Sequence, residues 1–123
     1  MADILIVDDN AAFRKMLKGA VLSKFPSMQI HEAKDALSAM EKTEEDVPDL
    51  IFVDIRLPGE NGLQLTKRIK TSYPHIVVIV ITSYDSPEYR DAALESGADF
   101  FVSKVESTTK DLVEKVELIF SPR

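Results

Sequence analysis

The chain has 123 residues, 45% of them hydrophobic and 29% charged, which is the size and balance of one globular domain with a single core. Its formal net charge of -6 argues against a segment that grips nucleic acid by itself. Cysteine is absent, which excludes disulfides and thiolate metal sites and fits a reducing cytosol.

The N-terminal residues carry no basic leader, and no apolar stretch approaches the ~20 residues of a membrane span. We therefore expect a cytoplasmic domain without membrane contact.

In the first part of the chain, apolar runs alternate with amphipathic segments. Residues 4–7 predict a buried strand that ends on Asp8 and Asp9, and Asn10 is the expected cap of a helix that stops before Pro26. The expected inward stripe of this helix is Phe13, Met16, Leu17, Ala20 and Val21. A weaker edge strand follows at residues 29–33, and Asp35 opens a helix. Its expected inner residues are Ala36, Leu37 and Met40, and the run Glu44-Glu45-Asp46 is interpreted as a solvated loop.

The centre of the chain is a run of four apolar residues, 50–53, that reads as a strand buried on both faces. It ends on Asp54, and the Pro58-Gly59 and Asn61-Gly62 pairs mark a turn. A carboxylate at the end of a buried strand is costly unless something pairs with it. Asp54 is therefore our candidate for the reacting group.

Five further predicted elements complete the alternation. Asn61 caps a helix closed by Pro74, and residues 76–81 give the strongest strand signal, which ends on Thr82-Ser83. A helix opens at Ser86-Pro87 and stops at Gly97; its expected inner face is Tyr89, Ala92 and Ala93. Residues 99–102 predict a fifth strand followed by Ser103-Lys104, and Thr108 with Asp111 resembles a capping box for the last helix.

Apolar strands joined by helical crossovers require a parallel sheet covered on both faces. The element count and right-handed crossovers predict an α/β, doubly wound, five-stranded parallel sheet in the flavodoxin-like order 2-1-3-4-5, with helices on both faces. Residues 1–123 then form one domain. Residues 121–123 are either a true C-terminus or the start of a linker to an absent output domain.

The ligand crevice of such a sheet lies beyond the carboxyl ends of its strands, where the strand order reverses. The expected groups there are Asp8, Asp9, Asp54, Thr82, Ser83 and Lys104. Carboxylates ~4 Å apart repel each other by about 4 kcal/mol at an effective dielectric of ~20. All-oxygen ligands select Mg²⁺ or Mn²⁺ to relieve this repulsion. An aspartate nucleophile with a metal, a lysine and a hydroxyl suits phosphoryl transfer onto Asp54.

These residues resemble the response regulator receiver domain of two-component signalling over essentially the whole chain. Asp8-Asp9 matches its acidic pair, and Asp54 with Pro58 and Gly62 matches its phospho-acceptor loop. Thr82-Ser83 matches its switch hydroxyl and the small residue after it, and Lys104 matches its lysine.

The resemblance implies a role for each residue. Asp9 and Asp54 would ligate Mg²⁺ directly, Asp8 through water, with the Arg56 backbone carbonyl completing the set. Ser83 would contact the phosphoryl group, and Phe101 matches the switch aromatic. This sequence departs from the family pattern at one position. The family's lysine is usually followed by a cis proline, whereas Val105 follows Lys104 here. A cis bond before a non-proline residue costs ~2.5–4 kcal/mol, so the resemblance does not imply the path of this loop.

The resemblance also implies partners. The phosphoryl donor would be a histidine kinase or a phosphotransfer protein, and the family allows a homodimer on phosphorylation. The face formed by residues 86–95, the Phe101 strand and the last helix would control an output such as transcription. Nucleic acid would be reached only through an output domain not present here, and residues 104–112 look like those of regulators that carry a helix-turn-helix.

Three other functions stay open. A haloacid dehalogenase-type phosphatase or phosphotransferase also uses a strand-end aspartate. Its chemistry requires a second acid two residues later, and that position is Arg56 here. A flavodoxin-like cofactor binder is disfavoured because tryptophan and a glycine-rich phosphate loop are absent. A receiver-like docking module that is never phosphorylated is the third.

Overall fold

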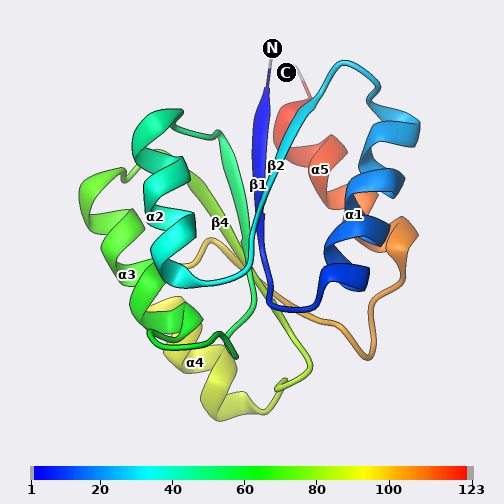
Figure 1. The fold of residues 1–123 in the computed structure, drawn as a ribbon. Helices are drawn as coiled ribbons and strands as arrows, with labels where there is room; N and C mark the ends of the chain where they lie inside the picture. The colour runs from blue at the N-terminus through cyan, green and yellow to red at the C-terminus, as the bar shows by residue number, and fades with distance from the viewer. Residues whose placement is uncertain (1, 122–123) are drawn as a thin grey trace.

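The computed structural model describes residues 2–121 as five strands and five helices in strict alternation (Figure 1). The elements are β1 (Asp3–Val7), α1 (Ala11–Lys24), β2 (Gln29–Ala33), α2 (Ala36–Glu45), β3 (Leu50–Val53), α3 (Gly62–Ser72), β4 (Val77–Thr82), α4 (Pro87–Glu95), β5 (Phe100–Ser103) and α5 (Thr109–Phe120). All strand pairs are parallel, in the order β2-β1-β3-β4-β5, which confirms the predicted fold. Of the expected linker at 121–123, the last two residues lie outside the described part.

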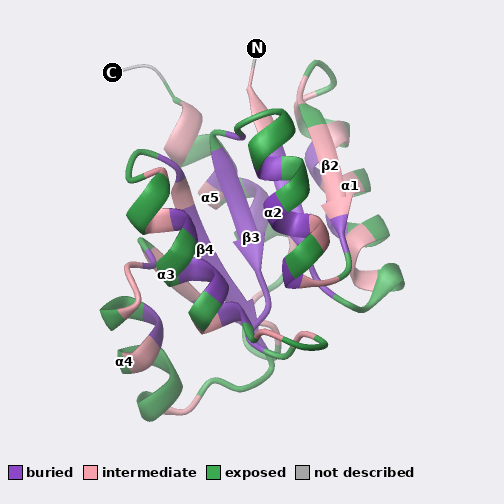
Figure 2. Cartoon of the chain, turned by 60° about the vertical axis from the view of Figure 1, so that its left-hand side comes forward, coloured by how far each residue is buried: buried purple, intermediate pink, exposed green. Residues whose placement is uncertain are grey.

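The sheet is buried on both faces because its central strands are apolar throughout. Neighbouring side chains of β3 point to opposite faces: Ile51 and Val53 pack beneath α2, α3 and α4, while Leu50 and Phe52 pack beneath α1 and α5. Figure 1 shows these two helical layers on the left and right of the sheet, and Figure 2 shows β3 and β4 buried between them. Burial of the sheet on both faces leaves its carboxyl end as the place where polar side chains gather.

Side-chain caps start the helices as the sequence predicts. Asn10, Asp35, Asn61, Ser86 and Thr108 each accept a hydrogen bond from a backbone N–H in the first turn that follows. The capping box at Thr108 is confirmed, and Asn61 forms a second one with Gln64. Among these described helices, none has both the length and the apolar character needed to cross a bilayer.

Several predicted inner residues face solvent instead. Met16 is 42% exposed and Leu37 is 73% exposed, so α1 and α2 are covered along a narrower stripe than their apolar residues suggest. Tyr89 is exposed too, and its ring packs edge-on against Tyr84 with 5.9 Å between centroids. The three residues Glu44-Glu45-Asp46 are exposed as predicted, but only Asp46 lies outside the helix: the interpretation of the two glutamates as loop is wrong, since they belong to the last turn of α2.

The last two strands begin and end one residue later than predicted. Thr82 is the last residue of β4 and Ser103 the last of β5, and both are buried. The Lys104 N–H then donates to the Thr82 carbonyl at 2.9 Å, which extends the pairing beyond the strand ends. No peptide bond among the described residues is cis, so the Lys104–Val105 bond is trans.

Gly62, at the start of α3, is where a side chain is least tolerated. A Cβ there would lie 2.0 Å from the Asp54 carbonyl oxygen and 2.9 Å from the Ile55 Cα, both backbone atoms. We expect Gly62→Ala to lower the free energy of unfolding by about 1–3 kcal/mol or more, because the loop between Asp54 and Gly62 must move. Urea denaturation followed by circular dichroism measures this.

Gly19, inside α1, is the matched control because a Cβ there would meet nothing within 4 Å. Gly19→Ala should stabilise the fold by about 0.5–1 kcal/mol, since alanine is the better helix former. Equal effects from the two substitutions would show that the close approach at Gly62 does not constrain the loop.

Candidate functional site

Asp54 lies directly after β3, and its backbone continues the sheet because its N–H donates to the Val7 carbonyl at 3.0 Å. The side chain is only 9% exposed. Oδ1 accepts the Arg56 N–H at 3.3 Å, and Oδ2 accepts Lys104 Nζ at 3.0 Å. The carboxylate is thus held at the carboxyl edge of the sheet by partners from two loops.

The acidic pair after β1 lies beside Asp54. Asp8 is 1% exposed, its Oδ1 accepts the Asn10 N–H at 2.9 Å, and its Oδ2 accepts Lys104 Nζ at 2.6 Å. Asp9 is exposed at the rim. One carboxylate oxygen from each of Asp8, Asp9 and Asp54 falls in a group whose members all lie within 4.8 Å of one another. Strands β1 and β3 are neighbours, and the three acids that follow them lie close together, as the sequence predicts.

Lys104 directly follows the edge strand β5, and its side chain reaches past the end of β4 to the acids that follow β3 and β1. Its ammonium contacts Asp8 and Asp54 together and lies over the Phe13 ring, 4.2 Å from the centroid. The aromatic face attracts the cation and shields it from water. The side chain is only 15% exposed, so this lysine is a fixed charge inside the site.

Burial and pairing shift the ionisation of these groups in different senses. Burial raises the pKa of the Asp8 carboxyl, and the hydrogen bonds from Lys104 and from the Asn10 N–H offset this only in part. For Lys104, burial acts to lower the pKa, but its hydrogen bonds to Asp8 and Asp54 outweigh that and raise it. The first shift favours a neutral carboxyl and the second a charged amine. The 2.6 Å contact is as short as a charge-assisted bond, so we treat the pair as ammonium and carboxylate.

The hydroxyl residues at the end of β4 differ in position. Thr82 is fully buried, and its Oγ1 accepts the Tyr84 N–H at 3.2 Å; its own O–H is a further donor. Ser83 is exposed beyond it. On β5, Phe101 is partly buried against the core beneath α2, α3 and α4, and the Arg90 guanidinium lies 5.2 Å from its ring centroid.

Two side chains at the site were missed by sequence reasoning. The Arg56 guanidinium donates to the Tyr84 hydroxyl at 3.0 Å and lies 4.8 Å from the centre of that ring. It therefore connects the loop after Asp54 with the loop after Thr82. Phe13, expected only in the core, also forms the surface beneath Lys104. Its place in the first turn of α1, four residues after Asp9, was the available signal.

The donor set fits a hard divalent cation. Asp8, Asp9 and Asp54 offer only oxygen, and one ammonium against three carboxylates leaves excess negative charge. Asp9 is exposed and makes no ion pair with Lys104, so its carboxylate is accessible from solvent. The backbone of Arg56 follows Asp54 closely enough to donate to its carboxylate.

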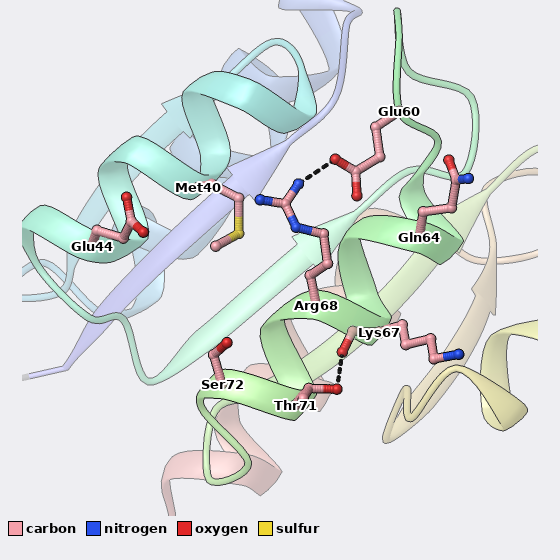
Figure 3. Close-up of a pocket in the computed structure, with 8 residues that line it drawn as sticks. All are labelled: Met40, Glu44, Glu60, Gln64, Lys67, Arg68, Thr71 and Ser72. Atoms are coloured by element: carbon pink, nitrogen blue, oxygen red, sulfur yellow. Dashed lines mark hydrogen bonds and ion pairs between the residues drawn. The ribbon is translucent and has the colours of Figure 1, made fainter.

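A separate hollow of about 820 Å³ lies between α2 and α3 (Figure 3). Its lining includes Met40, Gln64 and Lys67, and an ion pair between Arg68 and Glu60 lies within it. The converging residues at the strand ends do not line it. The candidate site is therefore the cluster at the carboxyl ends of the strands and not this hollow.

The fold and the strand-end cluster define a doubly wound α/β domain whose acids and lysine meet at the point where strand order reverses. Residues 4–117 match the family model described as the response regulator receiver domain. The chain belongs to this family, the receiver domains of two-component response regulators.

Individual relatives agree with this assignment. The transcriptional regulatory protein DegU of Brevibacillus brevis is 31% identical over 117 residues, which cover 94% of this chain and 49% of DegU. The transcriptional regulatory protein PhoP of Escherichia coli K12 is 35% identical over 101 residues, which cover 82% of this chain and 44% of PhoP. The crystal structure of a CheY-like receiver domain protein from Methanospirillum hungatei JF-1 superposes with a TM-score of 0.87 at 30% identity, covering 96% of this chain and 92% of that one. The chain thus spans less than half of the two curated regulators.

Proposed function

We propose that this domain is a signalling switch in which Asp54 accepts a phosphoryl group from a histidine kinase or a phosphotransfer protein. The observation that carries the proposal is the Lys104 ammonium, held at 3.0 Å from Asp54 and 2.6 Å from Asp8. A fixed cation beside a strand-end carboxylate is what transfer of a dianionic group onto that carboxylate requires. Family membership supports the same assignment.

In the reaction, an Asp54 carboxylate oxygen attacks phosphorus in line with the bond that breaks. With a phosphohistidine donor, a P–O bond forms as the P–N bond breaks, and the electron pair leaves with the imidazole. Lys104 would exchange its contact with the Asp54 oxygen for a phosphoryl oxygen, so the positive charge is already in place when negative charge arrives. The chain offers no acid two residues after Asp54, where the dehalogenase-type reaction wants one; Arg56 stands there, and its side chain binds Tyr84.

We assign Asp8, Asp9, Asp54 and the backbone carbonyl of Arg56 to hold Mg²⁺, or Mn²⁺ in its place. When bound, the ion supplies positive charge to the phosphoryl oxygens and offsets the repulsion among the acids. Asp8 would act through water, because one of its oxygens already accepts Lys104 and the other the Asn10 N–H.

The negative charge that a phosphoryl group adds at Asp54 would cause the change that a partner detects. Thr82 would donate its hydroxyl to the phosphoryl group, Ser83 would contact the same group, and Phe101 would move into the space that Thr82 vacates. The α4-β5-α5 face, which carries Phe101, would then change its affinity for a partner or for a second copy of the chain. The matched segment makes up less than half of each of the two curated regulators, and both are transcriptional regulatory proteins, which supports an output such as transcription through a further domain.

Acetyl phosphate as the phosphoryl donor tests the function without a kinase. The protein should gain one phosphoryl group, seen by intact mass, with Mg²⁺ present and none with excess chelator. Asp9→Asn removes one exposed acid from the cluster, so it should need at least about tenfold more Mg²⁺ for half-maximal uptake. Equal phosphoryl uptake with and without chelator would refute the metal assignment. If the wild-type protein takes up no phosphoryl group, the alternative of a docking module that is never phosphorylated would be favoured.

A further inference from the structure

A second group of side chains of the types that bind metals lies at the opposite end of the sheet. Asp3 begins β1, His31 is the middle residue of β2, and Asp46 follows the last turn of α2. In Figure 1 the start of β1 and the end of α2 are at the top, whereas the strands run downward to their carboxyl ends, and Asp54 follows the carboxyl end of β3. The receiver chemistry proposed above uses none of these three residues.

Their ligand atoms already converge. One carboxylate oxygen of Asp3, one of Asp46 and a ring nitrogen of His31 lie within 4.8 Å of one another. The His31 Nε2 atom is buried, and within residues 2–121 it has no hydrogen-bond partner. The nearest carboxylate oxygen of Asp46 is 3.9 Å away, which is too far for a hydrogen bond. The His31 side chain as a whole is 42% exposed, but its covered Nε2 atom lacks a partner where two carboxylates approach it, and an ion there would contact all three groups.

The surroundings have room for an ion and hold the ligands in place. A crevice of about 60 Å³ adjoins two of the three ligands: it is lined by His31, Asp46 and Glu45, together with Leu5, Lys42 and Pro48, but not by Asp3; a single water needs roughly 10–15 Å³. The Asp3 backbone is fixed from both sides, because its N–H donates to Asp49 Oδ2 and its carbonyl accepts the Asp49 N–H, each at 2.9 Å. The Asp46 N–H ends α2 by donating to the Lys42 carbonyl at 3.0 Å.

We propose that Asp3, His31 and Asp46 bind a divalent transition-metal ion of the Zn²⁺ class. An imidazole nitrogen with carboxylate oxygens suits Zn²⁺, which binds such ligands at ~2.0–2.2 Å, whereas the all-oxygen set at Asp54 suits Mg²⁺. Two ligands at that distance from one ion lie roughly 3.0–3.5 Å apart. The 3.9 Å between His31 and Asp46 therefore closes by a small rotation of the exposed Asp46 side chain. Water or Glu45 completes the coordination.

The two metal sites have separate consequences. An ion at Asp3, His31 and Asp46 ties β1, the edge strand β2 and the end of α2 together, so it raises the melting temperature by binding the native state. Strand β2 is an edge strand of the described sheet and pairs with β1 alone. A metal link to β1 and α2 should therefore stabilise β2 most. The Asp54 carboxylate is not part of it.

The test uses the two histidines of the chain as reporters. Zn²⁺ is titrated into the Asp9→Asn protein, in which the competing acidic cluster is weakened, and the imidazole protons are followed by NMR. The His31 resonances should shift and saturate at one equivalent, while those of His75, which is exposed after α3, should not move at that point. Adding Asp46→Asn should weaken the His31 response by about tenfold or more, and His75→Gln should leave it unchanged.

His31→Gln separates binding from folding, since thermal melts without metal report whether the variant is folded. It should lose the Zn²⁺-induced rise in melting temperature that the His75→Gln protein keeps. Parallel shifts of both histidines would show non-specific binding and overturn the proposal. So would an Asp46→Asn protein that binds as tightly as its parent.

Discussion

Asp54→Asn should abolish phosphoryl uptake from acetyl phosphate altogether. The substitution removes the only oxygen nucleophile that Lys104 contacts besides the buried Asp8, and an amide oxygen is a far weaker nucleophile than a carboxylate. The fold should survive, because asparagine keeps the shape of the side chain and an oxygen that can accept Lys104. Intact-mass measurement of both proteins, incubated side by side with Mg²⁺, reads the result.

Asp91→Asn is the matched control. Asp91 is an exposed aspartate on α4, away from the strand-end cluster, so its substitution makes the same change of charge without touching the site. The Asp91→Asn protein should label to the same extent as wild type. Labelling of the Asp54→Asn protein at the wild-type rate would place the acceptor on another residue.

Thr82→Ala should leave phosphorylation of Asp54 largely intact and disconnect it from the α4-β5-α5 face. Thr82 is fully buried at the end of β4, the strand between β3 and β5, and it carries a hydroxyl that can donate. In typical allosteric systems the coupling free energy corresponds to about a 5–150-fold change in affinity. In the Thr82→Ala protein, the ratio of the affinities with and without the phosphoryl group, measured for a partner or for dimer formation, should fall close to one. Amide chemical shifts on the face, with and without beryllofluoride as a phosphoryl mimic, report the same loss.

Two variants show whether the hydroxyl itself is responsible. Thr82→Ser restores the donor and should restore most of the response. Thr43→Ala removes another fully buried hydroxyl, which donates to the Ala39 carbonyl within α2, and it should respond like wild type. A full response of the face in the Thr82→Ala protein would exclude the proposed relay.

The fold was predictable because its signals are local. Residues 50–53 are apolar without interruption, which only a strand covered on both faces satisfies, and side chains such as Asn10 and Asn61 mark where helices begin. Parallel strand order then determines which loops meet. The convergence of Asp8, Asp54 and Lys104 followed from this order alone, although the first and last are 96 positions apart.

What could not be predicted depends on contacts between side chains from distant parts of the chain. Leu37 fits the helical stripe of α2, yet no neighbouring element reaches that far around the helix, and it stays exposed. The contact between Arg56 and Tyr84 needs both loops to be placed first. The group formed by Asp3, His31 and Asp46 carries no motif spacing, since it comes from two strands and the end of a helix.

Chemical trapping of the phosphoryl group tests the central claim most directly. Borohydride reduces an aspartyl phosphate to homoserine, so protein phosphorylated by acetyl phosphate, reduced and digested can be mapped by peptide mass spectrometry. We predict homoserine at position 54, dependent on both Mg²⁺ and the phosphoryl donor. Homoserine at Asp8, Asp9 or any other acid in place of position 54 would contradict the account, as would phosphoryl uptake that leaves no homoserine.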